Sequence, residues 1–114
     1  MPTIDQELGE AAVEVAWRLD VYDSYGCNEA TALRALKRRA PAYERDACAR
    51  ALDAARILWS ECRRVVDANE RLINHRGDTD LRPFRREMRS QVRRFGAAVV
   101  DHAVGMVVFY YHLK

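Results

Sequence analysis

Apolar residues recur along most of the chain at spacings of three and four, the period of one face of an α-helix. The first such segment predicts a helix over residues 3–26. A capping box formed by Thr3 and Gln6 is expected to begin it, and Gly26 to end it. Its apolar face consists of Leu8, Ala12, Val15, Leu19 and Tyr22.

Two further helices are predicted in the middle of the chain. Asn28 is a good N-cap for a short helix, which Pro41 ends because the residue before a proline avoids helical geometry. A long helix then covers residues 42–74 and stops near Gly77. Its apolar face consists of Ala47, Ala51, Ala55, Leu58, Cys62, Val65, Asn69 and Leu72.

A fourth helix is predicted from Asp80, which can cap it, to the end of the chain. Gly96 and Gly105 lie inside it and are expected to mark a bend or a close helix contact. Residues 97–111 are apolar nearly all round, as in a helix covered on every side. A strand over residues 107–111 is the alternative, but helical spacing continues on both sides of it.

These elements predict an all-α fold: one compact antiparallel bundle of about four helices over residues 1–114, two long, one medium and one short. Charged residues make up 32% of the chain, above the usual share of about 25%, which suits helices with solvated outer faces. Three cysteines without a close pair favour a reducing compartment such as the cytoplasm. Neither a signal peptide nor a membrane-spanning segment is visible.

The sequence offers little for catalysis, cofactors or metals. Paired cysteines, His-x-x-x-His and Glu-x-x-His spacings are absent, and there is no glycine-rich phosphate loop. His102 follows Asp101 in the apolar segment, where a buried imidazole beside a carboxylate could act as a base. A hydrogen-bonded core histidine, or a histidine at a subunit contact, is the preferred interpretation. An enzyme or ligand carrier with a pocket near His102, Tyr110 and Tyr111 is therefore the least favoured class.

Charge is distributed unevenly although the net charge is only +2. Residues 1–31 hold seven acids and one base, whereas residues 82–94 hold six arginines and one acid. On a continuous helix, four of these arginines share one face, which could follow a phosphate backbone. A solvated face is the simpler interpretation. The four residues are Arg82, Arg86, Arg89 and Arg93.

Val13, Trp17 and Val21 form a second apolar row on the first predicted helix, rimmed by acids. A tryptophan in a rimmed apolar patch is typical of a protein-binding hot spot. If the helix is instead packed between two others, both rows belong to the core. The sequence leaves these two interpretations open.

The sequence thus predicts a small non-catalytic interaction or regulatory protein that binds a protein partner. Self-association is expected through residues 97–111, because a helix that is apolar all round needs cover that a small domain cannot fully supply. A homodimer with Val108 and Tyr111 near its axis follows, and Gly105 would allow close approach. Nucleic-acid binding through the arginine row is the alternative.

Overall fold

The protein is described by a computed structural model that covers residues 3–21, 25–26, 28–74, 76 and 78–112, with the side chains of residues 111 and 112 left out. Within these ranges there is no strand, which confirms the all-α prediction. A single 3-10 turn, Glu70–Leu72, follows the longest helix. The α-helices of the described residues are α1 (Gln6–Asp20), α2 (Glu29–Arg39), α3 (Arg45–Ala68), α4 (Arg82–Glu87), α5 (Arg89–Phe95) and α6 (Ala97–His112).

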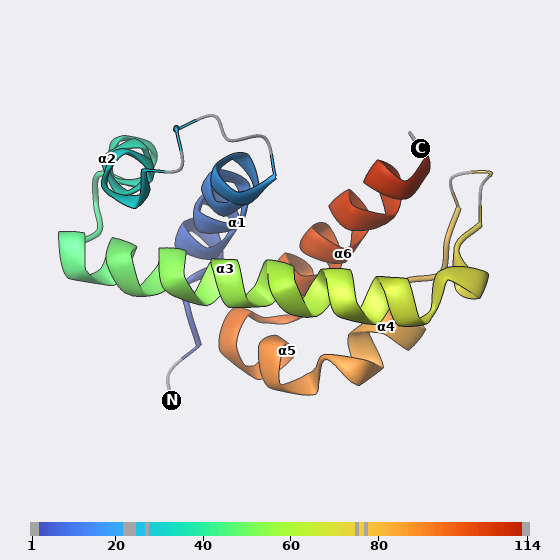
Figure 1. Cartoon of the computed structure of the whole chain (residues 1–114). Helices are drawn as coiled ribbons and strands as arrows, with labels where there is room; N and C mark the ends of the chain where they lie inside the picture. The colour runs from blue at the N-terminus through green and yellow to red at the C-terminus, as the bar shows by residue number, and fades with distance from the viewer. Residues whose placement is uncertain (1–2, 22–24, 27, 75, 77, 113–114) are drawn as a thin grey trace.

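Helix α3 runs across the molecule and organises the rest (Figure 1). Helices α1, α2 and α6 contact it on one side, and α4 contacts it on the other (Figure 1). Helix α1 also packs against α2 and α6, so it lies between neighbours. The expected antiparallel bundle of about four helices is only approximate, since the described residues form six α-helices. No helix in the described residues is long and apolar enough to cross a membrane.

The first two helix starts illustrate local capping. Asn28 caps α2 as predicted, because its side chain accepts a hydrogen bond from the Thr31 amide at 3.2 Å. The predicted capping box of Thr3 and Gln6 is wrong. Helix α1 begins after Asp5, and the Thr3 hydroxyl instead donates to the Arg93 carbonyl at 3.2 Å. A tertiary contact has therefore taken the place of the local one.

Helix α3 is shorter than predicted and ends at Ala68. Asn69, which was assigned to its apolar face, closes the helix instead. The Asn69 side-chain amide donates to the Val65 carbonyl at 2.8 Å and to the Glu87 carboxylate at 2.6 Å. It thereby satisfies a terminal carbonyl of α3 and links that end to α4.

The predicted fourth helix is three helices. Met88 departs from helical geometry (φ −116°, ψ 36°) and separates α4 from α5. Gly96 has φ +85°, a conformation that favours glycine, and separates α5 from α6. Residues 107–111 are helical, as preferred. The two breaks let buried Phe84, Met88 and Phe95 pack into the core, because the chain changes direction twice.

The buried thiol of Cys62 on α3 is expected to make the stability of the protein fall at high pH. Burial, with a smaller contribution from Glu61, raises the pKa of Cys62 from 9.0 to about 12. The folded state therefore keeps a proton that the unfolded state loses above about pH 9, so this stabilising contribution is lost as the pH rises toward 12. The free energy of unfolding should fall by up to about 1.4 kcal/mol per pH unit in this window from this group alone.

Chemical denaturation of the native protein and Cys62→Ala at pH 8, 9, 10 and 11 measures this effect. The stability difference between the two proteins should shrink as the pH rises. A difference that stays constant from pH 8 to 11 would show that Cys62 does not titrate differently in the two states.

Candidate functional site

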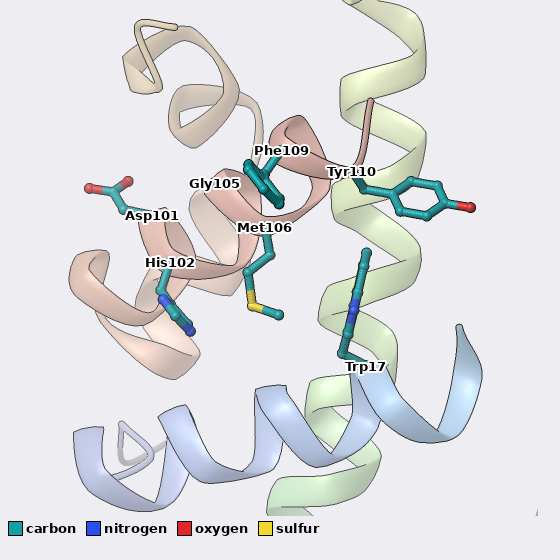
Figure 2. Close-up of a pocket in the computed structure, with 7 residues that line it drawn as sticks. All are labelled: Trp17, Asp101, His102, Gly105, Met106, Phe109 and Tyr110. Atoms are coloured by element: carbon teal, nitrogen blue, oxygen red, sulfur yellow. The ribbon is translucent and has the colours of Figure 1, made fainter. Parts of the chain in front are cut away.

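A shallow groove of about 460 Å³ lies between α1 and α6. We call it the α1–α6 groove. It opens to solvent, and Figure 2 shows the side chains of His102 and Met106 directed toward α1. Trp17 is the contribution of α1, and every other lining residue belongs to α6. The full lining is Trp17, Asp101, His102, Gly105, Met106, Phe109 and Tyr110.

Helical spacing puts the groove residues on one face of α6. His102, Met106 and Phe109 are separated by four and three positions, so their side chains are neighbours along the helix. The opposite face carries valines and an alanine that are all buried, and α6 packs against α1, α3, α4 and α5. The buried residues of this face are Val99, Val100, Ala103, Val104, Val107 and Val108. Helix α6 thus has more apolar surface than the rest of the chain covers.

Phe109 is the clearest sign of this surplus, because 63% of its surface is exposed. Only Ile57 and Leu72 are also large, apolar and exposed among the described residues. Gly105, one turn before Phe109, leaves open space beside it: an added Cβ would meet only Leu81 Cδ1, at 4.0 Å. A projecting ring therefore stands next to a hollow on the same face.

The inner wall of the groove is a stack of aromatic rings. Trp17 is 7% exposed and packs against Trp59 of α3, with ring centroids 4.4 Å apart. Tyr110 meets Trp17 edge to face at 5.8 Å, and Figure 2 shows Tyr110 beside the Trp17 indole. The Trp59 indole N–H donates to the Val13 carbonyl at 2.7 Å. This wall is fixed by contacts among three helices, so it is preformed.

Ion pairs fix the polar rim. Asp101 accepts from Arg85 of α4 at 2.9 Å, rather than pairing with His102. The His102 Nε2 atom lies 3.8 Å from Glu14 of α1, and Glu14 in turn pairs with Arg39 of α2. The less favoured interpretation, an imidazole acting beside the Asp101 carboxylate, is therefore not supported, since Asp101 pairs with Arg85. The His102 side chain is 43% exposed, so the interpretation as a core histidine is wrong, and the interpretation as a histidine at a subunit contact stays a prediction.

The structure answers the open question about the apolar row on α1. Val13 is fully buried and Trp17 nearly so, as expected for a helix packed between two others. Val21 is half-buried against the core. Val108 is also buried, at 5% exposed, so it offers little surface for the predicted contact near a two-fold axis. The Tyr111 side chain lies outside the described residues.

The four predicted nucleic-acid-binding arginines are exposed but are not aligned on one helix. Arg82 and Arg86 belong to α4, whereas Arg89 and Arg93 belong to α5, beyond the break at Met88. Arg82 is already paired with Asp80 at 3.0 Å, and this contact lowers the pKa of Asp80 to about 2. The single continuous row expected from the sequence is therefore corrected to two short segments.

Phe109 and Met106 line the α1–α6 groove, and sequence reasoning did not single them out as site residues. The sequence showed that residues 97–111 are apolar all round, but it could not say which side the rest of the chain covers.

In the described residues, no group of three or more His, Cys, Asp or Glu could hold a metal ion. Comparison with models of protein families finds none that matches the chain, and comparisons with curated proteins and with solved structures give no significant match.

Proposed function

We propose that the protein is a cytoplasmic interaction or regulatory protein that associates with a second copy of itself through the α1–α6 groove. The observation that best supports this proposal is the exposed Phe109 ring, which lies beside an apolar hollow on the same face of α6. Aromatic and methionine side chains are enriched in protein interfaces, and Met106, Phe109 and Tyr110 supply them here. The free, buried thiols of Cys48 and Cys62 suit a reducing compartment.

A second copy is the occupant that this shape favours. In a two-fold dimer the same patch meets itself, so a projection and a neighbouring hollow complement each other. Phe109 of each copy would enter the groove of its partner, over the open space beside Gly105. Because Asp101 and Glu14 already pair with arginines of their own chain, the rim places no unpaired like charges opposite each other. In the catalytic alternative, the carboxylate nearest His102 is that of Glu14, at 3.8 Å, and Arg39 already pairs with it.

If the protein dimerises through this groove, its mass in solution should depend on concentration, and one substitution in the groove should keep it monomeric. The native protein should be dimeric at high micromolar concentration and dissociate on dilution. Phe109→Glu should remain monomeric across the series, with at least about 100-fold weaker association, because it places two charges in a desolvated contact. Sedimentation equilibrium or light scattering across a dilution series measures both.

Ile57→Ser is the matched control, because Ile57 is also a large exposed apolar residue but does not line this groove. It should dimerise like the native chain. A native protein that stays monomeric at high micromolar concentration would refute the proposal. Val108→Glu is unsuitable as an interface test, since the burial of Val108 makes it a test of folding.

Nucleic-acid binding remains the alternative proposal, and the exposure of Arg86, Arg89 and Arg93 favours it. None of these three takes part in an ion pair within the described part of the chain. This alternative requires that the protein bind duplex DNA and that the affinity fall as salt is added. The logarithm of the binding constant should fall with the logarithm of the salt concentration, with a slope of about −0.9 for each phosphate contacted. Arg86→Gln with Arg89→Gln should then reduce the magnitude of the slope. If the protein dimerises and binds duplex DNA only weakly at low salt, the self-association proposal stands alone.

A further inference from the structure

A second groove, of about 580 Å³, lies between the start of α1 and the first half of α3. We call it the α1–α3 groove. It shares no lining residue with the α1–α6 groove, so an inference about it does not depend on self-association. Its volume is within the usual range for small-molecule sites. Its apolar wall consists of Ile4, Leu8, Ala47, Ala51, Ala54 and Ile57.

Small side chains on one face of α3 create this space. Ala47, Ala51 and Ala54 are separated by four and three positions, so they form a strip that no large side chain fills. Ile57 continues the strip by one further turn and is 50% exposed. An apolar residue of this size at the end of an alanine strip provides a continuous aliphatic surface.

The opposite wall is held by contacts distant in sequence. The Ile4 amide donates to the Arg94 carbonyl at 2.7 Å, which attaches the segment before α1 to the end of α5. The Tyr43 hydroxyl donates to Asp5, and this hydrogen bond is the main reason that the pKa of Tyr43 is raised to about 12. The groove is therefore a formed feature of the fold and not a gap between loose ends.

The polar groups of the groove favour an anion. Arg50 of α3 and Arg94 of α5 line it, and neither takes part in an ion pair within the described residues. The acidic group Asp5 is already hydrogen-bonded to Tyr43. Asp53 also lines the groove and takes part in no ion pair within the described residues, so one unpaired carboxylate accompanies the two arginines. Among the unpaired charges of the groove, the two arginines thus outnumber the single carboxylate of Asp53, and their guanidinium groups can donate to an anion.

We propose that the α1–α3 groove binds an aliphatic carboxylate of the fatty-acid type. The alkyl chain would lie along the alanine strip and Ile57, and the carboxylate would accept hydrogen bonds from Arg50 or Arg94. A guanidinium fits a carboxylate through two parallel hydrogen bonds, and an apolar wall with few polar groups is the usual composition of a small-molecule site. Binding would be non-covalent, with no chemical step.

Titration calorimetry of the full-length chain with dodecanoate, below its micelle concentration, tests the proposal. Dodecanoate should bind at one site, and dodecyltrimethylammonium, which has the same chain and the opposite charge, should bind at least about tenfold more weakly. Affinity should rise about fourfold for each methylene between octanoate and dodecanoate, as full burial of an aliphatic chain requires. Equal binding of the anionic and cationic probes, or binding of neither, would overturn the proposal.

Variants then locate the site. Ile57→Ser and the Arg50→Gln/Arg94→Gln pair should each weaken dodecanoate binding about tenfold, because one removes chain contacts and the other the head-group contacts. Arg45→Gln, an exposed arginine of α3 outside the groove, is the matched control and should bind like the native chain. Phe109→Glu should also bind normally.

Two results would contradict the assignment. Native affinity in both groove variants would place the ligand elsewhere. Affinity that falls as the protein concentration rises, as the dimer forms, would show that a second copy of the chain covers this groove instead.

Discussion

Replacing Trp17 by alanine is expected to lower the free energy of unfolding by about 3–5 kcal/mol, the usual cost of emptying a buried aromatic site. Trp17 is 7% exposed and lies between Trp59 and Tyr110, so its loss removes packing from three helices at once. The surrounding rings cannot close the cavity easily, because the Trp59 indole is held by its hydrogen bond to the Val13 carbonyl. Since small domains are stable by only about 5–15 kcal/mol, the change should be large in any denaturation curve.

Urea denaturation at low micromolar protein concentration measures this cost. Dilution matters, because dimerisation would add to the apparent stability. Phe109→Ala is the control: it removes an aromatic ring from the same groove, but one that is mostly exposed, and should change stability by less than about 1 kcal/mol. If Trp17→Ala and Phe109→Ala had equal small effects, the aromatic wall would not be part of the core.

A second large effect is expected at Gly9, where α1 comes close to its neighbours. An added Cβ would lie 3.3 Å from Phe95 Cδ1 and 3.4 Å from Val99 Cγ2, both on buried side chains. Gly9→Leu should therefore destabilise the protein by about 3 kcal/mol, since the extra atoms force packed helices apart. Gly9→Ala should be nearly neutral, because its gain in helix propensity of about 1 kcal/mol offsets the crowding.

Gly105→Ala is expected to stabilise the protein, in contrast to Gly9→Leu, and can be measured in the same denaturation experiment. Gly105 lies inside α6, and an added Cβ has only Leu81 within reach, at 4.0 Å. The substitution should stabilise the diluted monomer by up to about 1 kcal/mol through helix propensity alone. A stable Gly9→Leu protein would show that α1 does not approach α5 and α6 as closely as the contacts at Phe95 and Val99 indicate.

Local patterns in the sequence were sufficient for much of the helical structure. The spacing of Leu8, Ala12 and Val15 identified a buried face of α1, and Asn28 identified the start of α2. These features depend on neighbours within one or two turns, which the sequence states directly. The same holds for the helical assignment of residues 107–111.

Other features depend on contacts between distant segments. No glycine or proline near Met88 predicts a break in the helix. The chain leaves helical geometry there, and Phe84 and Phe95 on either side are both buried in the core. Thr3 lost its expected capping role to a hydrogen bond with the Arg93 carbonyl, ninety positions away. Alanines at positions 47, 51 and 54 fitted a core face as well as a groove wall.

Helix α6 shows most clearly which features the sequence determines and which features depend on the tertiary structure. By itself, the sequence determined that residues 97–111 form a helix with more apolar surface than one neighbour can cover. Only the tertiary structure decided that Val108 is buried and that Phe109 projects beside the groove. Helical spacing fixes which residues share a face, but the crossing of α1 and α3 over α6 fixes which face is covered.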